Sequence, residues 1–396
     1  ILPFGFFPNN DKKISGLIIP SYGESANMGF FLKDGGYYFT LTEKVDLSLK
    51  SNIHTKGSWS VKSQLRYKNR YRYNGNLNLN FGKNFNSEKG FPNYSEKKDF
   101  NIQWRHQQDP KAKPSLTFSA NVEAGSSSYH RNNSYNANDF LKNTMSSSIN
   151  LTKNWEGALI SNLTFNLRHS QNITTKNINL TIPDVSLNSK RFYPFKSIGS
   201  SAKIQWYDKI MIKYGMNTKN TISTADSLLF TKKSFSNFRN GMRHNIPIST
   251  SIKVLKHFTL NPSFNLTERW YLSQTEKRWN TNNNTIITDT IHKFTRAHNY
   301  NISTGLNTKI YGMIKFNKSK IAAIRHVITP NISFNYTPDF SDKKYGYYKN
   351  VQKNIEGETE QYSIMNNGVY GSPSKGKKGN ITLAISNILG MKIKSK

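Results

Sequence analysis

The sequence contains no cysteine, few acidic residues and no long apolar run. Without cysteine among its 396 residues, the chain can form no disulfide, zinc–thiolate site or cysteine nucleophile. Asn, Lys or Ser interrupts every apolar stretch well short of the ~18 residues of a transmembrane helix. Apolar residues make up 35% of the chain, against about 45–50% in soluble domains. This composition argues against a large soluble core.

Positive charge dominates, because 56 Lys and Arg residues outnumber 23 Asp and Glu and leave a formal net charge of +33. Such a charge favours an anionic partner. The joint abundance of Lys, Asn and Ile is also typical of compositional bias, and both interpretations stay open. Aromatic residues reach 13%, which argues against disorder, since disordered segments have few of them.

Nucleic acid is another partner to consider for a basic, aromatic-rich chain. Residues 66–73 interleave arginines with tyrosines, as a base-stacking platform does. Alternation along a strand, however, puts Arg66 and Tyr67 on opposite surfaces. We therefore expect no nucleic-acid partner.

Alternation of polar and apolar residues with a period of two is the strongest structural signal. In residues 71–81 the aromatic and aliphatic side chains fall on odd positions, while Arg72 and four asparagines fall on even ones. Many such runs reach ten residues, which is the length of a transmembrane β-strand with a polar lumenal face. The pattern predicts an all-β fold, a large antiparallel transmembrane β-barrel with roughly 16 strands in this segment. A large soluble β-sandwich or β-solenoid is the alternative.

Turn signals divide these runs. Lys56-Gly57-Ser58 and Asp34-Gly35-Gly36 are typical of tight turns. Longer polar stretches, expected as loops, lie at 85–98, 126–142, 171–198, 274–292 and 338–362. No linker divides the chain, so we expect one incomplete barrel domain over residues 1–396, with its first strands at 13–81 and later strands reaching 394.

Motifs for catalysis and metal binding are missing. Histidines occur at 54, 106, 169, 244 and 326, but none accompanies a recognisable nucleophile motif. The sequence also lacks a Gly-rich phosphate loop and a cluster of metal ligands. We expect a protein that is not an enzyme and that uses no cofactor, metal or catalytic residue.

The opening segment carries a family resemblance. Residues 7–25 read Phe-Pro-Asn-Asn-Asp-Lys-Lys-Ile-Ser-Gly-Leu-Ile-Ile-Pro-Ser-Tyr-Gly-Glu-Ser. They resemble the start of the barrel in the LptD family of outer-membrane lipopolysaccharide-assembly proteins. Further matches are Gly29, Tyr37-Tyr38, Asp46-Leu47-Ser48-Leu49, Lys56-Gly57, Arg66-Tyr67, and the Arg-His-x-x-x-Pro pattern of Arg325 to Pro330. Their order and spacing, rather than any single one, carry the resemblance.

The resemblance implies a non-enzymatic translocon of the Gram-negative outer membrane, a multi-pass β-barrel that inserts lipopolysaccharide into the outer leaflet. It implies four partners: lipopolysaccharide, outer-membrane lipid, an LptE-like plug lipoprotein, and an LptA-like periplasmic bridge that docks on an N-terminal jellyroll. Another outer-membrane barrel, such as a porin or a receptor for solute uptake, is the alternative function. An outer-membrane lipid hydrolase is a third.

The chain ends suggest a piece of a longer protein. Residues 1–5, Ile-Leu-Pro-Phe-Gly, follow no signal peptide, and residues 391–396 do not end in the aromatic residue expected of a last barrel strand. We expect the jellyroll and the gate-closing strands to lie outside this segment.

A lateral gate is implied at the first strand, where Pro8 and Pro20 match family prolines. Proline has no N–H to donate, so it weakens strand pairing and is confined to edges, ends and bulges. We expect these two residues to lower the free energy needed to open the wall. In the alternative interpretation, Pro20 simply lies in a bulge or at a strand end.

Basic residues on the polar parity are candidates for lipopolysaccharide contact. Lys and Arg on a lumenal wall would attract the phosphates and acidic sugars of that lipid. The lumenal candidates, all expected on the polar faces of adjacent strands, are Lys50, Lys62, Arg66, Lys68, Arg72 and Arg105.

Overall fold

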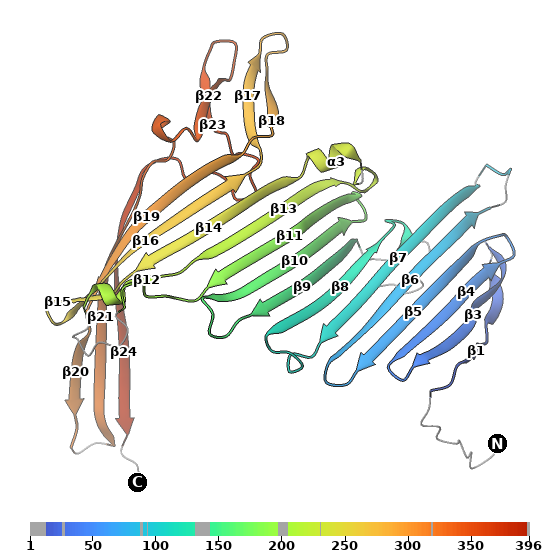
Figure 1. The fold of residues 1–396 in the computed structure, drawn as a ribbon, viewed down its shortest axis with the longest axis horizontal. Helices are drawn as coiled ribbons and strands as arrows, with labels where there is room; N and C mark the ends of the chain where they lie inside the picture. The colour runs from blue at the N-terminus through green and yellow to red at the C-terminus, as the bar shows by residue number, and fades with distance from the viewer. Residues whose placement is uncertain are drawn as a thin grey trace. The chain divides into compact units, whose positions relative to one another are not determined.

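A computed structural model describes residues 13–25, 28–87, 90–92, 94–130, 143–196, 205–229, 231–317 and 320–393 (Figure 1). Residue contacts divide the chain into two compact units. The first unit comprises Ile1–Asn154, Thr164–Asp184 and Asn220–Phe238, and the second comprises Trp155–Leu163, Val185–Lys219 and Arg239–Lys396.

Strands make up most of both units. The first half of the chain contains β1 (Gly16–Ile18), β2 (Ser21–Ser25), β3 (Gly29–Thr42), β4 (Val45–His54), β5 (Trp59–Asn69), β6 (Tyr73–Asn86), β7 (Ser95–Gln108), β8 (Leu116–Gly125), β9 (Thr144–Asn154), β10 (Ile160–Asn172) and β11 (Asn177–Ser189). Strands β3 to β9 form an antiparallel meander in which each pairs with the next, and β1 and β2 both pair with β3.

The second half follows the same plan. It contains β12 (Met211–Ile212), β13 (Gly215–Ala225), β14 (Arg239–Ser249), β15 (Ile252–Val254), β16 (Phe258–Tyr271), β17 (Gln274–Asn280), β18 (Thr285–Ile291), β19 (Thr295–Asn307), β20 (Ile310–Lys315), β21 (Ile321–Thr337), β22 (Tyr348–Gln352), β23 (Thr359–Ser363) and β24 (Lys378–Ile393). Antiparallel pairing runs from β14 through β16, β19 and β21 to β24. The helices that lie entirely within the described residues are one turn or little more: η1 (Tyr207–Lys209), η2 (Asp226–Leu228), α3 (Lys232–Ser236) and η3 (Lys343–Tyr345).

The predicted all-β, antiparallel fold class is confirmed, because 20 strands of the described residues belong to one sheet. Fifteen of these strands have 10 to 17 residues, and the sheet exceeds the expected count of roughly 16 because it also contains the short strands β1, β2, β12, β15 and β20. Within the described residues, no helix is long and apolar enough to cross a membrane.

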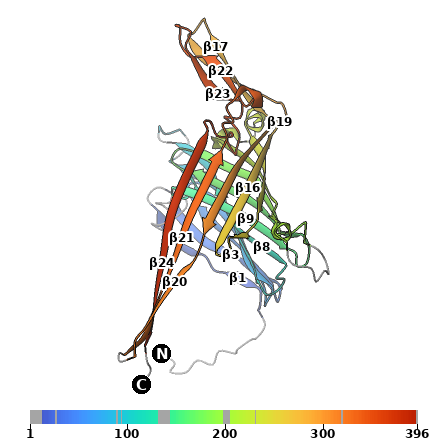
Figure 2. The same ribbon diagram turned by 90° about the vertical axis from the view of Figure 1, so that its left-hand side faces the viewer.

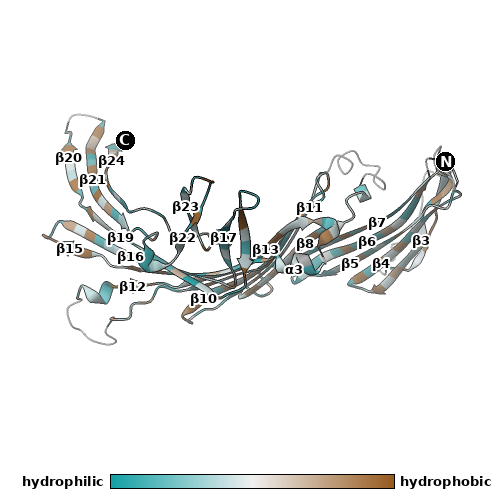
Figure 3. Ribbon diagram, turned by 90° about the horizontal axis from the view of Figure 1, so that it is seen from above, coloured by the Kyte–Doolittle hydropathy of each residue, from teal (hydrophilic) through white to brown (hydrophobic). Residues whose placement is uncertain are grey.

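The first unit buries polar side chains and exposes apolar ones. On β4, Asp46, Ser48 and Asn52 are 6–7% exposed, whereas Leu49 and Ile53 on the other face are 38% and 58% exposed. On β7, Asn101 is fully buried while its neighbour Ile102 is exposed. Polar and apolar residues alternate along the strands of Figure 3. This arrangement is the reverse of a soluble sheet, and it is typical of strands with lipid on one face and water on the other.

A β-bulge in β3 explains a turn signal that the sequence misplaced. Leu32 pairs with Ile53 and Gly35 with Ser51, so two residues of β3 oppose the single residue Asn52. Asp34 has a left-handed φ of 56°, and its amide donates to Asn52 Oδ1 at 2.8 Å. The prediction of a tight turn here is wrong, because the Asp-Gly-Gly segment supplies the extra residue of a bulge inside a strand.

The bulge also changes which positions of β3 face the apolar side. Before it the exposed apolar residues are Phe30 and Leu32, and after it they are Tyr37 and Leu41. One inserted residue shifts the alternation by one position, since side chains repeat with a period of two. The apolar face of β3 therefore carries even-numbered residues before the bulge and odd-numbered residues after it.

The other turn and loop predictions have mixed outcomes. The turn at Gly57 is confirmed, with φ at 88° between β4 and β5. The single loop expected at 171–198 is wrong, because β11 occupies Asn177–Ser189 within it. Strands β17–β18 form a hairpin inside the loop expected at 274–292, and β22–β23 form one that extends one residue beyond the loop expected at 338–362. Both hairpins lie at one end of the second unit (Figure 2).

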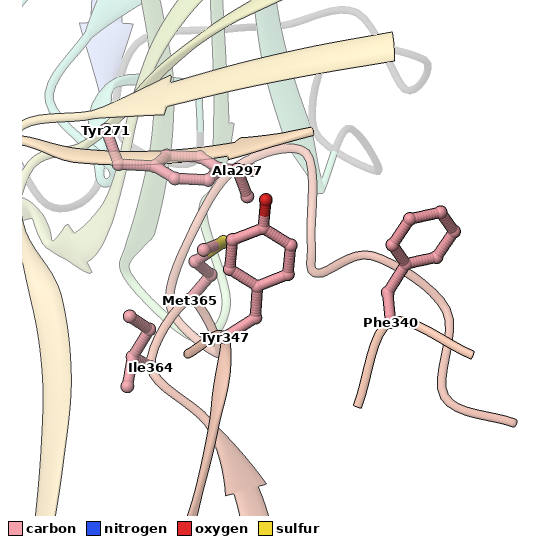
Figure 4. Close-up of a cluster of buried hydrophobic side chains, with 6 residues drawn as sticks. All are labelled: Tyr271, Ala297, Phe340, Tyr347, Ile364 and Met365. Carbon is pink, nitrogen blue, oxygen red and sulfur yellow. The ribbon is translucent and has the colours of Figure 1, made fainter. Parts of the chain in front are cut away.

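The second unit has an apolar core where segment 338–376 packs on β16 and β19. Its buried members are Tyr271, Ala297, Phe340, Tyr347, Ile364 and Met365, and they are drawn in Figure 4. Tyr271 is 1% exposed and its hydroxyl donates to the carbonyl oxygen of Gly371 at 2.7 Å. We call residues 338–376 the strap. The core fixes the strap on the sheet by burial of apolar surface.

Candidate functional site

Five of the six predicted basic residues lie on the strands of the first unit and share its polar face. Lys50 pairs with Lys62, and Lys62 pairs with Asn80. Arg66 pairs with Asn76, which pairs in turn with Arg105, and Lys68 pairs with Asn74. Directly opposed residues of an antiparallel pair point to the same face. The alternation in β5 to β7 therefore brings these cations together as the sequence predicts.

Arg72 is the exception, and its placement on a strand face is wrong. It lies in the turn between β5, which ends at Asn69, and β6, which begins at Tyr73. Tyr71 adopts a left-handed φ of 59°, and the Arg72 amide donates to the carbonyl oxygen of Asn69 at 3.0 Å. Residues 69–72 satisfy the polar–apolar alternation by coincidence, because a turn has no faces.

An open groove of about 1300 Å³ lies over β4 to β8 and the adjoining turns. Three of the predicted residues, Arg66, Lys68 and Arg105, line it. Lys50 and Lys62 line a smaller groove of about 280 Å³. Gln64 borders both. We call the larger one the basic groove.

Positive charge in the basic groove exceeds negative charge. Six cationic side chains and two carboxylates line it: Lys13, Lys44, Arg66, Lys68, Arg70, Arg105, Glu43 and Asp46. Three of these cations were not predicted. Lys13 precedes the first strand, and Lys44 and Arg70 lie in turns, where strand alternation gives no signal. Basic residues in turns next to a polar strand face would have been the signal to use.

One carboxylate of the groove is already paired. Asp46, whose side chain is 9% exposed, accepts from Arg66 Nε at 2.8 Å and from Lys13 Nζ at 3.0 Å. In the part of the chain that the structure describes, no carboxylate pairs with Lys50, Lys68 or Arg105. These three cations are therefore available to an external anion, and an arginine can hold a phosphate or carboxylate with two parallel hydrogen bonds.

The other face of the same strands carries an aromatic cluster. Tyr67 shares its hydroxyl with His106 Nδ1 at 2.8 Å and accepts from Trp104 Nε1 at 2.9 Å. Gly75 leaves room for the Tyr67 ring, since a Cβ there would lie 2.4 Å from ring atoms. These hydrogen bonds account for His106 structurally. In the described ranges, no group of three or more His, Asp or Glu side chains is arranged to hold a metal ion.

The first strand is interrupted at the proline that was predicted to form a gate. Ladder pairing with β3 stops at Ile18, opposite Gly36, and resumes at Ser21, opposite Lys33. Pro20 lies in this break, and a Cβ on Gly35 would lie 2.8 Å from Pro20 Cβ. Pro8, the other predicted gate residue, lies outside the described residues.

The break lies beside the β3 bulge. Residues Ile19 and Pro20 face Asp34, which belongs to the bulge of β3, and Gly35, which follows it. Two neighbouring strands thus lose regular pairing at one level of the sheet. The ladder between the first strand and β3 is therefore discontinuous at this level, since bulges and prolines both interrupt hydrogen bonding.

A family model described as "LptD protein" matches residues 1–396. No curated protein matches the chain.

Proposed function

This chain belongs to the LptD protein family, and from that premise we propose that it moves lipopolysaccharide into the outer leaflet along the basic groove. Membership of this family of transport proteins gives the chain a role in lipopolysaccharide transport at the outer membrane. The route, the gate and the partners that follow are our proposals. We further propose that residues 1–396 form part of one barrel domain and act without catalysis.

The observation that carries the proposal is the reversed polarity of β4 to β8. Asp46, Ser48 and Asn101 are buried on the polar face, while Leu49 and Ile102 are exposed on the other. Lipid covers the apolar face in this arrangement, and the groove with its cations faces water. Arg66 on β5 and Arg105 on β7 flank Asn76 on β6. Phosphates on a lipid head group could contact both arginines.

Pro20 supports a lateral gate at the first strand. Opening a barrel wall requires breaking the ladder between two strands, and each hydrogen bond already missing lowers that free energy by about 1 kcal/mol. The break at Ile19–Pro20 lies in the pairing with β3, which is bulged as well. Pro20 also has no N–H to donate to a strand on the other side, where we expect the gate-closing strand. We propose that Pro20, with Pro8 before it, marks the strand beside which the lipid chains leave.

The remaining partners follow from the same family role. We propose a Gram-negative outer-membrane location, an LptE-like lipoprotein within the lumen, and delivery by an LptA-like periplasmic bridge. The surrounding outer-membrane lipid contacts the exposed apolar face that carries Leu79 and Phe81.

Neutralising two groove arginines tests the function. In the full-length parent protein, in its own cells, we would combine Arg66→Gln with Arg105→Gln and measure newly surface-exposed lipopolysaccharide. A several-fold decrease at unchanged protein level is expected. Arg278→Gln is the matched control, because Arg278 lies on the β17–β18 hairpin, 68% exposed and paired with Asp289. Unchanged export in the double variant, with solute conductance through the purified protein, would instead favour a porin.

Crosslinking at the first strand tests the gate. Ser21 and Tyr22 pair with Lys33 and Leu32, so they point to opposite faces. A photo-crosslinking residue at each position should give a lipopolysaccharide adduct if the lipid passes this strand. Leu79, on the apolar face of β6, is the control. Adducts at Leu79 equal to those at Ser21 and Tyr22 would contradict passage at the first strand.

A further inference from the structure

Three arginines share one face of the second unit beneath the strap. Arg243 on β14 pairs with Arg269 on β16, and Arg239 lies four residues before Arg243 on the same strand. All three have the parity of Tyr271, which contacts the strap, and not that of the exposed Trp270. This face is therefore the one that the strap covers.

One turn of the strap lies directly over the three guanidinium groups. Arg239 donates from Nε to the carbonyl oxygen of Asn367 at 2.7 Å and from Nη2 to that of Gly368 at 3.3 Å. Arg269 donates from Nε to the carbonyl oxygen of Tyr370 at 3.3 Å. The Arg243 guanidinium lies 4.9 Å from the centre of the Tyr370 ring. We call residues 366–371 the latch.

The hydrogen-bond acceptors of these arginines are neutral. Among the described residues, no carboxylate forms an ion pair with any of the three arginines. Arg269 also donates to the Oδ1 atom of Asn299. Backbone carbonyl oxygens accept single hydrogen bonds without charge, whereas a phosphate accepts bidentate, charge-assisted bonds that are roughly twice as strong.

We infer that Arg239, Arg243 and Arg269 form a second anion site, which the latch occupies as a displaceable internal ligand. The ligand class is a phosphate monoester or diester. That this phosphate belongs to a lipid head group rests on the proposed function. The anion site itself rests only on the three arginines and the carbonyl oxygens that fill it.

The latch is held by Tyr271, whose hydroxyl donates to the carbonyl oxygen of Gly371 at 2.7 Å, and by Tyr370, which packs against the apolar core. Tyr347, Ile364 and Met365 belong to the apolar core and hold the neighbouring segments (Figure 4). The latch is closed on itself, because the Gly368 amide donates to the carbonyl oxygen of Met365 at 2.8 Å and the Gly371 amide to that of Gly368 at 3.1 Å. Displacement of the latch as one turn would break the Tyr271–Gly371 hydrogen bond and leave the core contacts of Tyr347, Ile364 and Met365 in place.

Gly368 offers a way to loosen the latch without touching the arginines. A Cβ on Gly368 would lie 2.7 Å from the ring of Tyr271 and 3.0 Å from the carbonyl oxygen of Met365. Gly368→Ala must therefore push the turn away from the sheet. The arginines would then be more accessible to an added anion.

The test is hydrogen–deuterium exchange of the full-length parent protein in detergent, read on peptides covering residues 366–371. Three probes are added separately: diphosphorylated lipid A, the same lipid without phosphates, and inorganic phosphate. The phosphorylated lipid should raise latch exchange at least threefold, while the dephosphorylated lipid leaves it unchanged. A rise with inorganic phosphate alone would assign the site to a free anion instead of a lipid.

Variants separate the anion site from a merely structural contact. Arg239→Gln with Arg243→Gln should raise latch exchange without ligand and abolish the response to phosphate, whereas Gly368→Ala should raise exchange but keep the response. Unchanged exchange with every probe in both the native protein and Gly368→Ala would overturn the inference. Because the export assay on Arg66 and Arg105 uses the other unit, failure of the proposed function is detected separately.

Discussion

Both units carry arginines on their polar faces, but these arginines are open in the first unit and covered in the second. In the first unit, Arg66 and Arg105 border an open groove. In the second, Arg239 and Arg269 donate to the carbonyl oxygens of the latch. The underlying strands are alike in length and in alternation, so the difference comes from the segments that join them.

Connecting segments thus decide whether a polar face is open to a ligand. The turn between β5 and β6 is short and leaves the basic groove uncovered, whereas the connection from β21 to β24 is long enough to fold back and build its own apolar core. An open cationic groove suits a surface along which a charged lipid slides. A covered one suits a site that must be unmasked.

Removing the strap's main contact should have the largest effect. Tyr271→Ala deletes a ring that is 1% exposed, and truncating a buried aromatic costs about 3–5 kcal/mol. We expect the strap to detach and become sensitive to limited proteolysis between 338 and 376. The polar face of the second unit would then be uncovered, as it is in the first. Tyr71→Ala, at a residue 80% exposed, is the control. Equal protease resistance in both variants would contradict the role given to this core.

Adding one methyl group to each unit sharpens the comparison. At Gly75 a Cβ would lie 2.5 Å from the carbonyl oxygen of Arg105, inside the ladder of β6 and β7. Overpacking of this kind costs about 1–3 kcal/mol, so Gly75→Ala should lower the thermal midpoint. Gly368→Ala should lower the midpoint less, because the latch can shift away from the Tyr271 ring without disturbing a strand ladder. The measurement is thermal unfolding in detergent. A lower midpoint for Gly368→Ala than for Gly75→Ala would contradict this prediction.

Removing a carboxylate from the basic groove should have a smaller effect. Asp46→Asn breaks the ion pairs with Lys13 and Arg66; partly exposed pairs contribute about 0–1 kcal/mol each. The variant also frees Arg66 for an external anion. We expect slightly lower stability together with tighter, more salt-sensitive binding of diphosphorylated lipid A, measured at two salt concentrations. Weaker binding would mean that Asp46 positions Arg66 for its ligand.

The smallest expected effect is on pH dependence at the base of the strap. The Ser341 hydroxyl and amide and the Gly376 amide donate to Asp339 and lower the pKa of its carboxyl below the ordinary value of 3.8. A lowered pKa stabilises the folded state above the ordinary value, and this contribution is lost as the pH falls through the lower folded value. The protection factor of the Gly376 amide, which compares its exchange with that of an unstructured amide at the same pH, should fall more between pH 5 and pH 3 in the native protein than in Asp339→Asn. Identical pH responses would contradict this.

Strand content and the shared polar face could be predicted from the sequence, because alternation follows directly from backbone geometry. Lys62, Arg66 and Arg105 are placed correctly by parity alone. Arg72 is misplaced because a turn continued the alternation by chance, and the β3 bulge was taken for a hairpin turn because Asp-Gly-Gly suits both. The cations of the turns and the three arginines under the latch could not be found, since their proximity depends on how connections far apart in sequence fold back.

The central claim, that lipopolysaccharide travels over the polar face of the first unit, is tested most directly on β6. Asn76 lies between Arg66 and Arg105, and Leu77 beside it points to the other face, opposite Leu65 and Trp104. A photo-crosslinking residue would replace each in the full-length protein in its own cells. The account predicts a lipopolysaccharide adduct at Asn76 that is at least several-fold stronger than at Leu77. Equal adducts at both, or a stronger adduct at Leu77, would contradict it.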